Sequence, residues 1–313
     1  MTTKKTKAKT KTRSEIGGFL DELARQGLAE RTRACYASDL AHFARWYGVS
    51  NGEGLSAARV TPTDVRGYKA HQQTVQNLKP ATINRRLATL RKFFLWAKAQ
   101  GLIAGLPTDD VAGVPTVPTA PRSLSRQDLN KLTRAAEQDA LRPDASWYAR
   151  RNLAIVQLLR YTGIRVGELS ALRQSDLEMS ERKGALTVRS GKGGKFREVP
   201  LGVEARRPLQ DYLDHRPDIP DDHVFVGQRG VGLAPEAVAD VVKKYADRAG
   251  LENVTPHVLR HSFGRGLVDA GVDLVTVATL LGHERLETTA IYTRPSAEDL
   301  ERAVERLEGG GRQ

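Results

Sequence analysis

HVLRH (257–261) and LLGHERLETTAIYTR (280–294) are the stretches that decide how this 313-residue chain is interpreted. The first places a histidine three residues before an arginine. The second places a histidine nine residues before a tyrosine. With Arg165 and Lys192 upstream, the chain supplies two arginines, a lysine, two histidines and a phenol. Guanidinium groups bind phosphate bidentately, and a phenol assisted by a cation or base is a nucleophile. The set is suited to holding and attacking a phosphodiester without a metal.

Each of these residues, taken singly, favours a structural interpretation. Arg165 follows a Thr-Gly break and is typical of a residue near a helix end. Lys192 lies in GKGGK, which is typical of an exposed hairpin and lacks the spacing of a Walker A loop. His261 is expected to point away from the face of Arg260 if the two lie on a helix, and Tyr292 alone is more typical of a core aromatic. The order of the whole set is what favours a functional interpretation.

The net charge is +12, and its excess lies in the first third of the chain. Residues 1–13 contain six basic and no acidic residues, residues 14–108 contain 13 basic and 7 acidic, and residues 109–313 contain 30 of each. A basic region favours contact with a phosphate backbone. For residues 1–13, which are expected to be a disordered tail, a solubilising role is equally favoured.

Other features of the composition limit the cellular compartments in which the protein is expected. Cys35 is the single cysteine, which excludes intrachain disulfides and a cysteine-based zinc site. No run approaches the roughly 20 apolar residues of a membrane span, and no apolar segment typical of a signal peptide follows the basic start. The expected location is the cytoplasm, in association with the nucleoid and without a membrane partner.

Residues 14–108 are predicted to form a helical domain. Thr61-Pro62-Thr63-Asp64 is a helix start, with a cap, a proline in the first turn and an acid. Pro80 opens another helix, whose apolar stripe is Ile83, Leu87, Leu90 and Phe94. The opposite face carries four basic residues, Arg85, Arg86, Arg91 and Lys92. This face is either a DNA-backbone contact or, more commonly, a solvated charged face.

The rest of the chain is predicted to be a linker and a second domain. Residues 109–122 are rich in proline and small residues and are expected to link the domains. Residues 123–313 are predicted to be mainly helical, with one β-hairpin over 185–201. The expected helices cover residues 147–162 and about 203–215, 235–249, 257–270, 273–281, 286–293 and 296–308.

The ordered motifs TGIRVGEL (162–169), SGKGGKFREVPL (190–201), HVLRHSF (257–263), LLGH (280–283) and IYTR (291–294) resemble the tyrosine recombinase (integrase) family, and most closely its Xer-type members. The resemblance covers the whole second domain, and a basic helical first domain is similar to the family's SAM-like core-binding domain. It implies a fold that is mainly α with a small β-sheet, arranged as a two-domain, C-shaped clamp around DNA.

The resemblance also implies roles for individual residues. Arg165 and Arg260 would hold the scissile phosphate, and Lys192 would protonate the departing 5′ oxygen. Glu168, one turn after Arg165, would order the site.

Three further roles follow from the same resemblance. His257 would assist proton transfer, and His283 would donate a hydrogen bond to the phosphate. Tyr292 would form a 3′-phosphotyrosyl link that conserves bond energy, so no metal, ATP or other cofactor is expected.

The implied partners are double-stranded DNA recombination sites and further copies of the chain. Four protomers would act on two sites through a Holliday junction, with residues 296–308 docking on a neighbour or on their own protomer. The sequence leaves open whether a partner recombinase or accessory protein takes part. It also leaves open three biological roles: dimer resolution, transposon resolution or movement, and integration. The absence of a visible arm-binding domain favours a simple Xer-like enzyme over a phage integrase of the arm-binding kind.

Two alternatives compete with recombination. A type IB topoisomerase uses a similar set of residues but acts alone and relaxes supercoils. A DNA-binding protein without catalysis is disfavoured by the complete set of residues.

Overall fold

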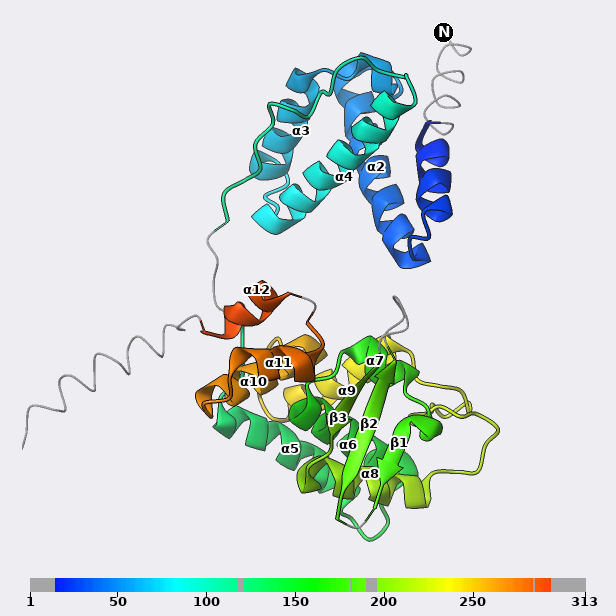
Figure 1. Ribbon diagram of the computed structural model, residues 1–313, viewed down its shortest axis with the longest axis vertical. Helices are drawn as coiled ribbons and strands as arrows, with labels where there is room; N and C mark the ends of the chain where they lie inside the picture. Colours follow the sequence, from blue (N-terminus) through cyan, green and yellow to red (C-terminus); the bar gives the residue numbers. More distant parts are fainter. Residues whose placement is uncertain (1–14, 117–120, 181, 190–195, 284, 294–313) are drawn as a thin grey trace, which may run out of the picture. The chain divides into compact units, whose positions relative to one another are not determined.

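The computed structural model describes residues 15–116, 121–180, 182–189, 196–283 and 285–293. The chain divides into two compact units, Met1–Pro118 and Thr119–Gln313. The described parts of both are mainly helical, and the second also contains a small antiparallel sheet, which confirms the predicted two-domain, mainly α fold with a small sheet (Figure 1). No helix within the described ranges is long and apolar enough to cross a membrane.

The first unit is a helical bundle around an aromatic core. Its elements are a helix over 15–25, α2 (Glu30–Asn51), η1 (Ala57–Arg59), α3 (Pro62–Thr74) and α4 (Pro80–Ala99). The predicted start of α3 is confirmed, because Thr61 and Asp64 exchange side-chain and backbone hydrogen bonds in a capping box. The apolar stripe predicted on α4 is buried throughout: Ile83, Leu87, Leu90 and Phe94.

The segment after α4 remains attached to the first unit. Val111 is buried in the core of this unit. The Asn84 side chain donates to the Val114 carbonyl at 2.9 Å and accepts from the Val114 backbone N–H at 2.8 Å. Lys69 donates to the Ala112 carbonyl at 2.7 Å. The stretch expected to link the domains, 109–122, is therefore packed on the first unit over its first residues, and 117–120 lie outside the described residues.

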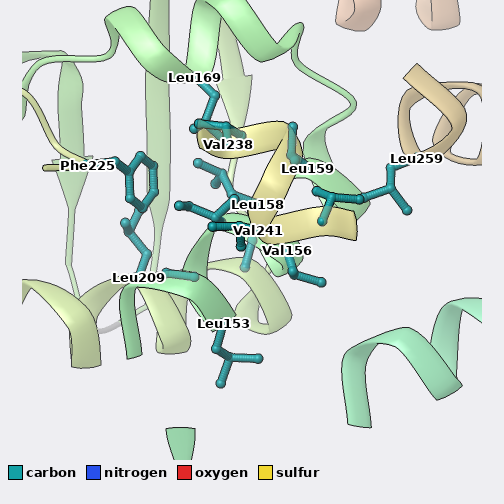
Figure 2. Close-up of a cluster of buried hydrophobic side chains, with 14 of the residues drawn as sticks. Leu153, Val156, Leu158, Leu159, Leu169, Leu209, Phe225, Val238, Val241 and Leu259 are labelled. Atoms are coloured by element: carbon teal, nitrogen blue, oxygen red, sulfur yellow. The ribbon is translucent and has the colours of Figure 1, made fainter. Parts of the chain in front are cut away.

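The second unit is built around α6 (Trp147–Thr162), which has the bounds predicted from the sequence. Residues 151–159 are all buried, as expected for a helix that is covered on every side. Figure 2 shows Leu158 and Leu159 of α6 among side chains of α8, α9 and α10, including Leu209, Val241 and Leu259. The surrounding helices are α5 (Arg126–Ala140), α8 (Val203–His215), α9 (Pro235–Arg248) and α10 (Pro256–Asp269).

The sheet has three strands in the order β1-β2-β3, which lie side by side in Figure 1. The predicted hairpin corresponds to β2 (Gly184–Arg189) and β3 (Phe196–Pro200), paired antiparallel with Leu186 opposite Val199. β1 (Leu177–Met179), preceded by η2 (Gln174–Asp176), was not predicted, because three residues carry no readable alternation. The hairpin tip with Lys192 lies outside the described residues.

Short elements complete the second unit. They are α7 (Val166–Ala171), α11 (Leu274–Leu281), α12 (Leu286–Thr289) and η3 (Ala290–Thr293). The expected helix over 286–293 is thus divided into one α-helical and one 3₁₀ turn. The helix expected over 296–308 lies outside the described residues.

Candidate active site

The backbone at Gly163 brings the end of α6 against α10. Gly163 ends α6 in the left-handed conformation, with a φ of 59°, and a Cβ here would lie 2.4 Å from the Phe263 ring. Glycine satisfies both requirements, because it adopts positive φ without strain and has no side chain. The chain then turns, so that Arg165 occupies the N-cap of α7.

Three arginines converge on the C-terminal end of α11. Arg197, Arg260 and Arg165 donate to the carbonyls of three consecutive residues, at 3.1, 2.7 and 3.0 Å; these residues are Leu280, Leu281 and Gly282. The last carbonyls of a helix have no partner within it, and cations are stabilised there by the helix dipole. We call Arg165, Arg197 and Arg260 the arginine cluster.

Glu168 joins two members of the arginine cluster. It accepts from the Arg197 guanidinium at 3.0 and 2.8 Å, and from the backbone and guanidinium of Arg165 at 2.7 and 2.8 Å. Burial alone would raise the pKa of Glu168, but the bonds from Arg197 and then from Arg165 hold it at about 2. Glu168 is therefore ionised at neutral pH and orients both guanidinium groups.

Arg260 is the most enclosed member of the arginine cluster. It is 4% exposed, and it also donates to the Gly163 carbonyl at 2.7 Å. Burial, and then the charge of Arg165, lowers its pKa to about 10, so it stays charged at neutral pH. The Arg165 side chain, by contrast, is 42% exposed. The cluster thus has an inner cation and an outer one.

Tyr292 lies in η3 and is only 2% exposed. A Cβ on Gly264 of α10 would lie 2.8 Å from Cε2 and Cζ of Tyr292, so the ring rests directly on the helix backbone. Its hydroxyl lies 3.2 Å from Nδ1 of His261. Burial raises the pKa of the phenol, whereas the charges of Arg260 and Arg165 lower it. The predicted nucleophile is therefore within the field of the arginine cluster.

His283, one of the two histidines predicted for the site, lies beside this phenol. His283 follows Gly282, its Nδ1 lies 2.9 Å from the Thr289 hydroxyl, and its ring stacks on Tyr292 with centroids 6.2 Å apart. Burial, and then Arg260 and Arg165, lowers the pKa of His283 to about 4, so it is neutral at neutral pH.

His257, in the first turn of α10, is exposed, and its ring centroid lies 6.4 Å from that of His261. This ring pair with His261 is its link to the group. Of the residues predicted for catalysis and its support, the structure brings together Arg165, Glu168, Arg260, His283 and Tyr292, with His257 beside His261 at the edge. Lys192 lies outside the described part.

Two residues of the site were missed by the sequence interpretation, Arg197 and His261. Arg197 and Val199 are two residues apart on β3, so both side chains lie on the inward face of the strand. An arginine at an inward strand position indicates that a buried partner is present, and this was the available signal. His261 was assigned a structural role. Its contact with Tyr292 joins residues 31 apart, which helical spacing does not reveal.

The basic residues predicted on α4 are all engaged within the first unit. Arg85 pairs with Asp39, and Arg86, whose side chain is 16% exposed, donates to Gln72 at 3.0 Å. Arg91 donates to the Val111 carbonyl, and Lys92 lies over the Tyr36 ring. The side chain of Arg85 is half exposed, so it keeps a solvent-facing charge.

Comparison with known proteins shows the same architecture. The phage integrase family model matches residues 122–299, and the phage integrase N-terminal SAM-like domain matches 16–101. The tyrosine recombinase XerD of Ralstonia nicotianae is 34% identical over 292 residues, 91% of each chain. The tyrosine recombinase XerC of Thermodesulfovibrio yellowstonii is 34% identical over 294 residues, 91% of this chain and 92% of that one. A XerH recombinase structure, solved bound to its palindromic difH substrate after cleavage, shares the fold, with a TM-score of 0.76 at 22% identity over 92% of this chain and 84% of that one.

Proposed function

This chain belongs to the phage integrase family and is a Xer-like site-specific tyrosine recombinase; from that premise we propose that Tyr292 attacks a DNA phosphodiester and forms a 3′-phosphotyrosyl intermediate. The observation that carries this proposal is the burial of the Tyr292 hydroxyl within the field of Arg165 and Arg260. A bond forms between the phenol oxygen and phosphorus, and the bond from phosphorus to the 5′ oxygen breaks. The phosphotyrosyl bond conserves the energy needed for rejoining.

The arginine cluster is the proposed phosphate site. Its three cations face one carboxylate, Glu168, which leaves two positive charges for an anion. Preorganised donors stabilise charge as it develops in the transition state, and guanidinium groups fit the non-bridging oxygens. Arg165 supplies the exposed donor to the phosphate, while the positive charge of the buried Arg260 stabilises the phosphate electrostatically. Glu168, itself held by Arg197, keeps Arg165 in place, and two backbone carbonyls keep Arg260 in place.

The remaining roles complete the reaction. Neutral His283 can donate a hydrogen bond to a phosphate oxygen without adding charge. Lys192 is proposed to give a proton to the departing 5′ oxygen, and His257 to assist proton transfer.

At the level of assembly, we propose that four protomers bind two duplex sites and exchange strands through a Holliday junction. Residues 296–308 are proposed to dock between protomers, and Arg85 with its neighbours on α4 to contact the DNA backbone. The biological role proposed is resolution of chromosome or plasmid dimers, or resolution or integration of a mobile element, on nucleoid DNA. A requirement for a partner recombinase or accessory protein would appear in the assay below as a covalent complex on the purified sites without exchange of the flanking markers.

The experiment begins with the substrate. The Y292F protein selects bound duplexes from a random library, and the recovered inverted repeat is rebuilt with a nick beside each candidate cleavage position. Wild-type protein is expected to form a covalent complex that survives denaturation, and Y292F is expected to bind equally and form none. A covalent complex with Y292F would overturn the assignment of the nucleophile.

A plasmid with two copies of the selected site separates the alternative functions. Exchange of the flanking markers supports recombination. Relaxation of supercoils without exchange would support a topoisomerase instead. Binding with neither product, and no covalent complex, would leave a DNA-binding protein without catalysis.

A further inference from the structure

His261 is the side chain in hydrogen-bond contact with the proposed nucleophile. Its Nδ1 lies 3.2 Å from the Tyr292 hydroxyl, and the two rings are 5.6 Å apart at an angle of 58°. An Nδ1 that accepts from a hydroxyl belongs to the neutral tautomer with its hydrogen on Nε2. In that tautomer, the phenol proton points at a group that can take it.

The backbone of α10 fixes this contact. His261 and Gly264 are three residues apart, so they lie on the same side of the helix. Gly264 supports the Tyr292 ring from below, and His261 meets its hydroxyl. The preceding residue, Arg260, is anchored to two carbonyls. The same helix therefore places the phosphate-binding cation and the partner of the phenol in a fixed relation.

We propose that His261 is a catalytic residue that accepts the Tyr292 proton. This inference rests on the proposed function. As the phenol oxygen bonds to phosphorus and the 5′ oxygen departs with a proton from the general acid, the phenol hydrogen moves to Nδ1 and gives an imidazolium. During rejoining, the 5′ hydroxyl returns its proton to the general acid as its oxygen attacks phosphorus. The phenol oxygen leaves, and the imidazolium gives its proton to the phenol oxygen.

The charges around His261 favour this role. The groups facing it are His257 and Arg260 on α10, Tyr292 on η3, and His283 after α11. Burial, and then His257 and Arg260, lowers the pKa of His261, so it is neutral and able to accept at neutral pH. A phosphodiester anion on the arginine cluster would offset the nearby positive charge and strengthen the base. Proton acceptance is thereby tied to bound substrate.

The test compares H261A and H261N with wild type. The asparagine carbonyl can still accept a hydrogen bond, but it cannot take a proton. H215N, at an exposed histidine on α8, is the matched control. Single-turnover formation of the covalent complex is measured against pH, on the nicked duplex selected by Y292F, with DNA binding measured in parallel.

Both His261 variants are expected to bind DNA normally and to react about 10²- to 10⁴-fold more slowly near neutral pH, the usual contribution of a general base. The wild-type rate should fall as the pH drops through the lowered His261 pKa. The rate of H261N should instead keep rising with pH above neutrality, since it then depends on the ionised phenol. H215N should match wild type.

Three outcomes are decisive. If H261N reacts at the wild-type rate with the wild-type pH profile, His261 only orients the phenol and the proposal is wrong. If H261A is also unaffected, the contact has no role in the reaction. If the wild type itself forms no covalent complex on the duplexes it binds, the proposed function fails, which is a separate result from either of these.

Discussion

Asp39, which is buried in the first unit, and Glu168, which is partly buried in the second, are two acids that each hold a pair of arginines. Asp39 of α2 pairs with Arg85 and lies 3.8 Å from Arg86, both on α4, so it ties two helices together. Glu168 binds Arg165 and Arg197 beside the end of α11.

The difference lies in what surrounds each pair. Near Asp39, Arg86 also donates a hydrogen bond to Gln72 and lies near His42. These side chains form an internal polar network. Near Glu168, a further buried arginine, Arg260, donates to carbonyls, and a phenol lies within its field. The same ion-pair chemistry therefore stabilises the fold in the first unit. In the second unit, where the additional arginine and the phenol lie beside it, it forms part of the proposed active site.

The largest expected effect comes from a substitution at the arginine cluster of the second unit. In R260K, an ammonium on a flexible stem replaces the rigid fork that joins the Gly163 and Leu281 carbonyls, so the positive charge is no longer held in a fixed position. Loss of one preorganised group that stabilises charge in the transition state costs about 10²- to 10³-fold in rate. We expect that loss in covalent-complex formation, with DNA binding retained.

R160K is the matched control, because Arg160 also donates to a carbonyl, that of Leu129, but outside the arginine cluster. An equal loss in both variants would mean that the effect is general destabilisation.

The second prediction concerns a substitution at the Asp39 ion pair of the first unit. D39N removes a charge that is 4% exposed and that pairs with Arg85 and accepts from Thr89 at 2.9 Å. Leaving a buried partner unsatisfied costs about 1–3 kcal/mol. We expect a lower free energy of unfolding in denaturant titration, with an unchanged cleavage rate per folded molecule. A lower cleavage rate at unchanged stability would contradict the assignment of this pair as scaffold.

A third, smaller effect depends on pH. The pKa of Glu168 is held at about 2, below the ordinary value for glutamate. A depressed carboxyl pKa gives stability that is complete above the unfolded-state pKa and is lost as the pH falls toward the folded-state value. The stability difference between wild type and E168Q should therefore be full at about pH 7 and smaller at about pH 3.5. The control is E198Q at exposed Glu198 of β3. A difference that is constant across this range would show that Glu168 is not ionised by its arginines.

The smallest effect concerns DNA contact by the first unit. R85A removes a half-exposed cation and should weaken binding equally across sequences. The slope of log affinity against log salt should fall by about one, as expected for one phosphate contact. K98A, at an exposed lysine near the end of the same helix, is the comparison. If R85A leaves the slope unchanged, this face of α4 does not bind the DNA backbone.

Much of the fold is visible in the sequence because it depends on local rules. The bounds of α6 and α8 follow from apolar spacing and breaks, and α3 follows from its cap and proline. β1 is too short to show a period. Val111 was assigned to a linker because proline-rich composition carries no sign of the core that buries it.

The site is predictable to the extent that it follows a family motif. Arg165, Glu168, Arg260 and Tyr292 were found by order along the chain. Arg197 and His261 were not, because their partners come from distant segments: Arg197 meets Glu168 across 29 residues, and His261 meets Tyr292 across 31. Contacts of this kind are set by packing, which no spacing rule encodes.

The attachment of all three arginines to the end of α11 has a consequence for heat inactivation. α11 has only eight residues and is held at its start by the Asp273 cap and at its end by Gly282. Short helices open locally at lower cost than a whole domain unfolds. Fraying of this one helix would remove one carbonyl partner from every arginine of the cluster at once, and would leave only the bonds to Glu168 and to the Gly163 carbonyl. Recombination is therefore expected to cease reversibly on warming at a temperature where α6 and its core are still intact.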